Sequence, residues 1–272
     1  MSEIHTTAII HDGAEIDEDV TIGPFCIIGG NVKIKEGTRL MNNVVVEGDA
    51  EIGDSCTVYP FTSIGLAPQD LKYNDEPTGV RIGNRNIIRE YTSIHRGSVG
   101  GDGYTVIGDD NFMMAYIHIA HDCRVGNRTV MANAVTLAGH VEIEDCAVIG
   151  GIVAVHQFNR VGAYAMVGGF SGVTQDVPPY MVSSALGSKL RLYGLNIVGL
   201  KRYGFSAETL SELKRAYHIL FREGLTLKDA VKKVQEELPY SEEIAHLIEF
   251  INANRRGICR PGKNSPGRNK AE

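Results

Sequence analysis

Aliphatic residues recur at every sixth position over most of the chain, from Ile4 to Val173, with a break after Ile64 and a slip of one residue after Ile94. Of the 26 positions in this pattern, 24 are Ile, Leu or Val and two are Met. A period of six matches neither an α-helix nor a simple strand. It is typical of a parallel β-helix built from hexapeptides, and an ordinary β-sandwich with coincidental spacing is the weaker interpretation.

Stacking in such a solenoid follows directly from the period. Each hexapeptide supplies one strand and one turn, so three hexapeptides complete a coil of about 18 residues. Residues i, i+18 and i+36 should then lie above one another, with coils about 4.8 Å apart. The spacing leaves the handedness of the coil open, although strand crossovers are normally right-handed.

Two interruptions and a change of pattern divide the chain. Residues 66–80 and 95–106 depart from the repeat, and we expect both to form surface loops, where solenoids commonly bind ligands. After Val173 the pattern becomes helical, with expected helices over 206–223, 226–238 and 241–255. We therefore predict a β-helix domain over 1–190 with these two loops, and a small α-helical C-terminal domain with a basic tail over 191–272.

Composition narrows the function classes. The chain has 272 residues, 31 glycines, no tryptophan and a net charge of -6. An acidic balance disfavours a nucleic-acid partner, and no apolar run is long enough to span a membrane. Five widely spaced cysteines without a CxxC motif, and no visible secretory signal, favour a cytoplasmic protein with reduced thiols.

A stripe of polar residues is the candidate site. By the 18-residue rule, His121 lies beneath Gly139 and Gln157, and Asp122 lies beneath His140. His118 and His156 belong to the same three coils. Imidazoles so clustered could bind a metal ion or act as a general base near neutral pH, and a set of solvated surface histidines is the remaining interpretation. His121 and Asp122 would point to opposite faces of a regular strand, but a corner can bring them together.

The ordered motifs carry a resemblance to a known family. They are IHRG (94–97), HIAHDC (118–123), LAGH (137–140), HQF (156–158), QDLKY (69–73), QDVPPY (175–180) and GLKR (199–202). With the hexapeptide repeat, they resemble the UDP-N-acetylglucosamine acyltransferases, within the large hexapeptide-repeat acyltransferase family. The resemblance implies a left-handed parallel β-helix and a homotrimer with sites between subunits. It also implies transfer of a (3R)-3-hydroxyacyl group from acyl carrier protein to the 3-hydroxyl of UDP-N-acetylglucosamine, the first step of lipid A biosynthesis, without a metal or cofactor.

The resemblance also implies roles for individual residues. His121 would be the general base, Asp122 would orient it, and the Gly139 N–H would stabilise the oxyanion. Gly151 and Gly169 would line the groove for the acyl chain. The implied substrate-binding residues are Gln69, Asp70, Lys72, His118, His140, His156, Gln157 and Arg202.

Some features depart from the family pattern or leave other functions open. Tyr203 stands where a second arginine is common, and the stretch 182–193 is about two residues longer than usual. A neighbouring N-acyltransferase, a zinc-dependent carbonic anhydrase on the same coil, and a non-enzymatic scaffold are the alternatives. An acidic carrier protein would need a local basic patch, and the candidates are Lys201, Arg202, Lys214, Arg215, Arg255, Arg256 and Arg260.

Overall fold

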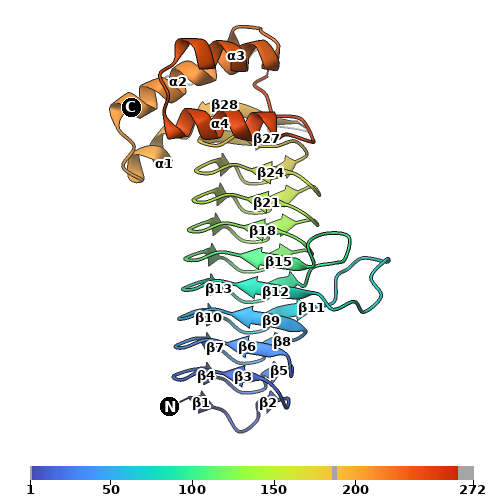
Figure 1. The fold of residues 1–272 in the computed structure, drawn as a ribbon. Helices are drawn as coiled ribbons and strands as arrows, with labels where there is room; N and C mark the ends of the chain where they lie inside the picture. Colours follow the sequence, from blue (N-terminus) through green and yellow to red (C-terminus); the bar gives the residue numbers. More distant parts are fainter. Residues whose placement is uncertain (1, 186–188, 263–272) are drawn as a thin grey trace.

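The computed structural model describes residues 2–185 and 189–262 and shows a tall prism of stacked coils, capped at one end by helices (Figure 1). Three sheets form its sides, and their strands pair in parallel except for the last pair of one sheet, which is antiparallel. In Figure 1 the chain rises from the N-terminus while its front strands run from right to left, so the parallel β-helix is left-handed. This confirms the predicted fold class, including the handedness that the residue spacing left open.

We call the three sides sheets A, B and C. Sheet A consists of β1 (Glu3–Ile4), β4 (Thr21–Ile22), β7 (Arg39–Leu40), β10 (Thr57–Val58), β13 (Ile87–Ile88), β16 (Phe112–Met113), β19 (Val130–Met131), β22 (Val148–Ile149), β25 (Met166–Val167), β27 (Met181–Ala185) and β28 (Leu190–Leu195). Sheet B consists of β2 (Ile9–Ile10), β5 (Ile27–Ile28), β8 (Val45–Val46), β11 (Ser63–Leu66), β14 (Ser93–His95), β17 (His118–Ile119), β20 (Thr136–Leu137), β23 (Ala154–Val155) and β26 (Gly172–Val173). Sheet C consists of β3 (Glu15–Ile16), β6 (Val32–Ile34), β9 (Asp49–Ile52), β12 (Gly79–Ile82), β15 (Tyr104–Ile107), β18 (Arg124–Val125), β21 (Glu142–Ile143) and β24 (Arg160–Val161).

The aliphatic positions of the repeat form the core of the prism. Ile28, Ile64 and Ile119 are fully buried, as are most of their equivalents on other coils. Ile4 is 45% exposed because no coil lies below the first one. Burial of one branched side chain per hexapeptide stabilises the coil without aromatic bulk, which accounts for the low aromatic content.

The two interruptions leave the coil at the same corner. We call the corners A–B, B–C and C–A after the sheets that they join. Between β11 and β12 the chain makes a loop over 67–78, and between β14 and β15 it makes a second loop over 96–103. Both protrude from the B–C corner, on the right of Figure 1.

Four helices follow the coil: α1 (Ile197–Arg202), α2 (Ala207–Arg222), α3 (Leu227–Glu237) and α4 (Glu242–Asn252). The last three begin at Ser206, Thr226 and Ser241, whose hydroxyl oxygens accept backbone N–H bonds as N-caps. These three helices were predicted from the sequence, whereas the short α1 was not. The longer stretch noted at 182–193 includes positions 186–188, which lie outside the described residues. None of the helices in the described part could cross a membrane.

A buried ion pair joins the helical region to the coil. The Arg160 guanidinium donates to Asp176, which is 1% exposed, and also to the carbonyl oxygen of Phe250 in α4. The Arg160 guanidinium also lies 4.1 Å from the centroid of the Phe250 ring. The segment after α4 returns to the coil, because Asp176 bonds with the backbone of Gly257 and Cys259. The helical region is therefore anchored to the upper coils by the Arg160–Asp176 pair and by the segment after α4.

Candidate active site at the B–C corner

Three coils place the predicted polar stripe at the B–C corner. Residues 121–122, 139–140 and 157–158 lie above one another, because His118, Thr136 and Ala154 are in register on sheet B. Backbone hydrogen bonds join each corner to the next, as from His140 N–H to the His121 carbonyl at 3.1 Å. The stacking predicted from the 18-residue rule is therefore confirmed.

The corner itself brings His121 and Asp122 together. Asp122 has a φ of 59°, in the left-handed region that Asp tolerates better than most residues. The chain therefore turns between the two side chains, and His121 Nδ1 lies 2.8 Å from Asp122 Oδ2. With Nδ1 engaged by the carboxylate, Nε2 is the nitrogen left to exchange a proton with a substrate.

Asp122 is a buried carboxylate with several donors around it. The Ser98 backbone N–H donates to it at 3.0 Å, and the Ser98 hydroxyl donates to Oδ2 at 2.6 Å. Burial alone would raise the pKa of Asp122, but the hydrogen bonds from His121 and Ser98 hold that pKa below its ordinary value. Ser98, which the sequence reasoning missed, therefore fixes an ionised carboxylate beside the imidazole.

The charge of Asp122 acts in turn on His121. The hydrogen bond to Asp122 raises the pKa of His121 above its ordinary value, against the opposing effect of burial. The Asp70 carboxylate adds to this increase from a greater distance. His121 is thus a stronger base than a free imidazole, and it is oriented by a carboxylate in the way that general bases of acyl-transfer enzymes are.

Gly139 lies directly against the His121 ring. A Cβ atom on Gly139 would come within 2.6 Å of His121 Cε1 and 2.7 Å of Nε2, so only glycine fits there without displacing the ring. Among the described residues, no group accepts a hydrogen bond from the Gly139 N–H. A free backbone donor beside a base is the arrangement that can stabilise a developing oxyanion.

A cavity of about 600 Å³ opens beside the imidazole. We call it the corner cavity. One wall comes from loop 67–78 and the other from the B–C corner. It contains six of the residues predicted for the site, namely Gln69, Asp70, Lys72, His121, His140 and Gln157.

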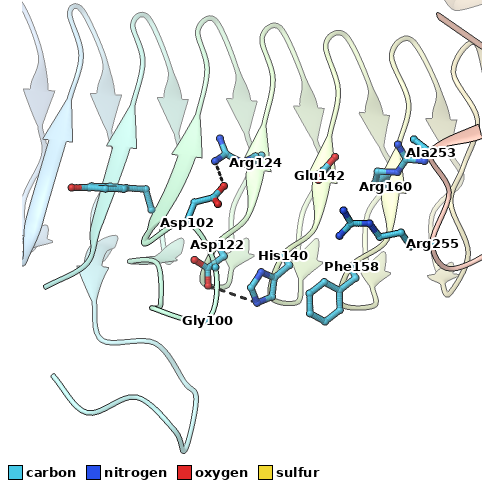
Figure 2. Close-up of a pocket in the computed structure, with 12 residues that line it drawn as sticks. Gly100, Asp102, Asp122, Arg124, His140, Glu142, Phe158, Arg160, Ala253 and Arg255 are labelled. Carbon is cyan, nitrogen blue, oxygen red and sulfur yellow. Dashed lines mark hydrogen bonds and ion pairs between the residues drawn. The ribbon is translucent and has the colours of Figure 1, made fainter. Parts of the chain in front are cut away.

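A second cavity, of about 520 Å³, lies on the sheet C side of the same corner (Figure 2). We call it the sheet C cavity. It shares Gly100, His140 and Phe158 with the corner cavity, so the two adjoin. Arg255, from the segment after α4, also lines it. A ligand larger than the corner cavity could therefore extend from the imidazole toward sheet C.

An aromatic stack separates the two cavities. The rings of His140 and Phe158 are stacked with centroids 4.5 Å apart. The Arg256 guanidinium lies 5.8 Å from the Phe158 centroid, on the segment after α4. Of the predicted basic patch, the structure thus places Arg255 and Arg256 at the edge of the site.

Three predicted substrate-binding residues lie outside both cavities. His118 is on the outer face of sheet B, where its Nδ1 lies 2.8 Å from the Ser93 hydroxyl. His156 is exposed, and its Nδ1 bonds with a backbone carbonyl. Arg202 is exposed at the end of α1.

Tyr203, the residue that departs from the family pattern, explains where Arg202 lies. Its ring packs edge-on against Tyr164 at 5.1 Å. Tyr164 has a φ of 57° and belongs to the C–A corner. Within one chain, Arg202 is therefore at a different corner from His121. Tyr203 packs α1 onto the coil.

The two predicted groove glycines are at the A–B corner. Gly151 and Gly169 are stacked, since a Cβ atom on Gly169 would lie 3.1 Å from the Gly151 carbonyl oxygen. Neither has a positive φ, so neither is required there for backbone conformation. Sheet B separates them from His121 within one chain.

His95 is a buried residue that the sequence reasoning left without a role. It is 5% exposed, its Nδ1 has no hydrogen-bond partner in the described part of the chain, and its ring packs edge-on to His118 at 5.0 Å. Burial, followed by the charges of His118 and His121, lowers the pKa of His95 to about 4. The ring is therefore neutral at neutral pH and supports the imidazoles above it by packing.

Metal binding by this cluster can be judged from its donors. In the described part of the chain, His121, Asp122 and His140 are the group whose ligand atoms come within 4.8 Å of one another. This set contains two histidines, whereas a zinc site of the carbonic anhydrase type uses three. Asp122 is also already occupied by hydrogen bonds from Ser98 and His121. The arrangement suits proton transfer better than coordination of zinc.

Comparisons with known proteins agree with the geometry. The model described as UDP N-acetylglucosamine O-acyltransferase, domain 2, matches residues 176–259, and the bacterial transferase hexapeptide model matches residues 31–66. The chain is 66% identical over 260 residues to the acyl-(acyl-carrier-protein)–UDP-N-acetylglucosamine O-acyltransferase of Thermodesulfovibrio yellowstonii, covering 96% of this chain and 100% of that protein. It is 47% identical over 264 residues to the protein of the same description from Burkholderia orbicola, with the same coverage. The solved structure of a UDP-N-acetylglucosamine acyltransferase from Francisella novicida is 39% identical, with a TM-score of 0.92 over 96% of this chain and 95% of that one.

Proposed function

The chain belongs to the UDP-N-acetylglucosamine O-acyltransferase family, and from that premise we propose that it transfers a (3R)-3-hydroxyacyl group from an acyl carrier protein thioester to the 3-hydroxyl of UDP-N-acetylglucosamine. This reaction would be the first step of lipid A biosynthesis, carried out in the cytoplasm. The observation that carries the proposal is the His121–Asp122 pair with the free Gly139 N–H beside it.

The proposed mechanism is direct attack without a covalent enzyme intermediate. The sugar 3-hydroxyl oxygen attacks the thioester carbonyl carbon while His121 Nε2 takes the hydroxyl proton. Asp122 stabilises the resulting imidazolium, and the Gly139 N–H donates to the oxyanion of the tetrahedral intermediate. The carbon–sulfur bond then breaks, and the imidazolium returns its proton to the departing thiolate. No step requires a metal or cofactor.

The corner cavity is proposed to bind the sugar nucleotide. Asp70 and His140 would hold the glucosamine beside His121, and Lys72 and Gln69 would bond with the sugar or the acyl 3-hydroxyl. Gln157, at the upper end of the cavity, would contact the diphosphate, with His156 beside it. Arg202 would reach a phosphate only from a neighbouring subunit, because it lies at the C–A corner of its own chain.

An exposed apolar corner supports a homotrimer. The rings of Phe61, Tyr91 and Tyr116 stack along the A–B corner with centroids 5.2 and 4.9 Å apart, and each side chain is about half exposed. Ile152 and Phe170 continue this corner toward the helices and are 55% and 79% exposed. A continuous apolar strip of this kind usually marks a protein contact, and we propose that a second copy of this chain covers it.

The same trimer would form the acyl groove. Above His118, the outward positions of sheet B are Thr136, Ala154 and Gly172, whose side chains decrease in size along the stack. An acyl chain whose thioester carbonyl lies beside His121 could therefore extend along sheet B toward Gly151 and Gly169, between two subunits. Two stacked glycines at its far end leave room for a long hydroxyacyl chain.

Replacing Gly169 by methionine should shorten the preferred acyl chain. The new side chain would extend over Gly151, 3.1 Å from its carbonyl oxygen at Cβ. Each methylene of the acyl chain that can no longer be buried costs about 0.8 kcal/mol. If the groove is shortened by about two methylenes, kcat/KM for the longest donors should fall about tenfold. A competition among carrier-bound donors of graded length measures this. An unchanged length profile in an active Gly169→Met trimer would show that Gly169 is only a turn residue.

The donor protein is proposed to dock near the segment after α4. Acyl carrier protein is acidic and this chain is also net acidic, so attraction must come from a local basic surface. Arg255 and Arg256 lie at the edge of the two cavities, where the thioester must arrive. We therefore favour these residues over the rest of the basic patch.

One assay tests the proposed function. The purified protein is incubated with hydroxyacyl carrier protein and either UDP-N-acetylglucosamine or its 3-amino analogue, and the products are identified by mass. An O-acylated sugar nucleotide, formed equally well in the presence of a chelator, supports the proposal. Transfer only to the amine would change the acceptor, and stoichiometric zinc with CO₂ hydration would support the carbonic anhydrase alternative.

A further inference from the structure

Loop 67–78 supplies one wall of the corner cavity, yet it has few contacts with the rest of the chain. Its hydrogen bonds are mostly internal, such as those from Lys72 N–H to the Asp70 carboxylate and from the Tyr73 hydroxyl to the Glu76 carbonyl. Leu71 is fully exposed at its tip. In the described part of the chain, one side-chain hydrogen bond joins this loop to residues outside it, from Arg96 to Tyr73.

The Arg96 guanidinium uses one nitrogen to bond with the loop and another to bond with the coil. Nε donates to the Tyr73 hydroxyl at 2.8 Å, and Nη1 donates to the Gly65 carbonyl on β11 at 3.1 Å. The guanidinium also lies 5.3 Å from the centroid of the Tyr73 ring. Gly48, on the adjacent coil, leaves the space for it, since a Cβ atom there would come within 3.0 Å of Nη1. Arg96 is therefore held by the coil on one side and holds the loop on the other.

The segment that carries Arg96 also supports the catalytic pair. The Arg96 N–H donates to the Leu66 carbonyl, the Gly97 N–H donates to the Gly79 carbonyl, and Ser98 donates twice to Asp122. Three consecutive residues thus connect the start of loop 67–78, its end and the carboxylate that orients His121. These bonds fix the two ends of the loop relative to the imidazole, and the part of the loop between them is held by the Arg96 side chain.

We propose that Arg96 is a positioning residue that clamps loop 67–78 at the distance from His121 at which the acceptor sugar is bound. Resting on the function proposed above, this means that Arg96 sets the affinity for the sugar nucleotide through Tyr73 and touches neither substrate. Lysine could not replace it, because one ammonium lacks the planar fork that reaches Tyr73 and Gly65 together.

The first test is proteolytic and does not depend on activity. Lys72 is the only lysine or arginine in loop 67–78, and it is exposed, so trypsin cleavage after Lys72 reports on loop opening. We expect Arg96→Gln to accelerate this cleavage about tenfold, and Tyr73→Phe, which keeps the ring and removes the hydroxyl, to accelerate it less. Arg222→Gln is the matched control, because Arg222 makes the same kind of contact with Tyr217 in α2, with a 3.0 Å bond to its hydroxyl.

The second test separates positioning from general stability. We expect Arg96→Gln to raise KM for UDP-N-acetylglucosamine about tenfold, with a smaller change in kcat and no change in KM for the carrier-bound donor. Simple loss of folded enzyme would lower the apparent kcat and leave both KM values unchanged. Tyr73→Phe keeps the test valid if Arg96→Gln does not fold, since Tyr73 lies in the loop.

The outcomes divide clearly. Faster cleavage at Lys72 together with a raised acceptor KM supports the clamp. Cleavage at the wild-type rate in both variants, or faster cleavage with an unchanged acceptor KM, overturns it. A wild-type protein that acylates no sugar nucleotide would refute the proposed function, and the cleavage rates would still decide whether Arg96 holds the loop.

Discussion

Replacing His121 by alanine is expected to lower kcat by a factor of about 10² to 10⁴, the usual contribution of a positioned general base. The side chain is only partly buried at the edge of a cavity, so its removal should leave the coil folded. The measurement is steady-state kinetics with saturating donor and acceptor, alongside thermal unfolding of the same preparation. By contrast, His118→Ala should act mainly on KM, because His118 is on the outer face of sheet B at the start of the proposed acyl groove.

His218→Ala is the matched control for this experiment. His218 is an exposed histidine in α2, paired with Glu223 at 3.5 Å and remote from the coils that carry the site. Its replacement should leave kcat unchanged. Near-normal turnover in a folded His121→Ala protein would remove His121 from the role of base.

Replacing Gly139 by alanine should lower kcat by about 10²-fold, although only one methyl group is added. The new Cβ would lie 2.6 to 2.7 Å from His121 Cε1 and Nε2, closer than such atoms can approach. The ring must then move, and a displacement of about 1 Å at a reacting group costs about 10²-fold in rate. Because the imidazole is shifted rather than lost, KM for the acceptor should rise as well.

Gly29→Ala provides the control. Gly29 follows β5 on sheet B, several coils below the site, and a Cβ atom there would meet backbone at 3.3 Å, a contact that a small shift can relieve. We expect turnover within about twofold of the wild-type protein. If Gly139→Ala is as active as Gly29→Ala, the close contact between Gly139 and the His121 ring does not affect turnover.

The regular part of this site follows from the sequence. The six-residue period fixes the stacking, and the stacking alone places Gly139 above His121 and His140 above Asp122. The corner conformation at Asp122 then explains how neighbours in the chain can face one another. These relationships are local and periodic, so no knowledge of distant contacts is needed to predict them.

The contacts made by the two loops could not be predicted from the sequence. Ser98 bonds with Asp122 across 24 residues and Arg96 bonds with Tyr73 across 23, and neither separation is a multiple of the coil length. Inserted residues break the arithmetic, so their partners depend on how two loops pack at one corner. Helix α1 was not predicted for a different reason. It has only six residues, and it depends on Asn196 as its N-cap and on packing against the coil.

The pH dependence of kcat/KM tests the central claim, which is that His121 acts as the base because Asp122 orients its ring and raises its pKa. A base must be deprotonated, so kcat/KM should fall as the pH drops through the pKa of His121 in the free enzyme. Asp122 raises that pKa above 6.5, with a contribution from Asp70, so the acid limb of the wild-type profile should lie above pH 6.5. In Asp122→Asn the limb should move to lower pH and the plateau should fall, because the imidazolium has lost its partner. An acid limb at the same pH in both proteins, or no limb between about pH 5 and pH 9, would contradict this account.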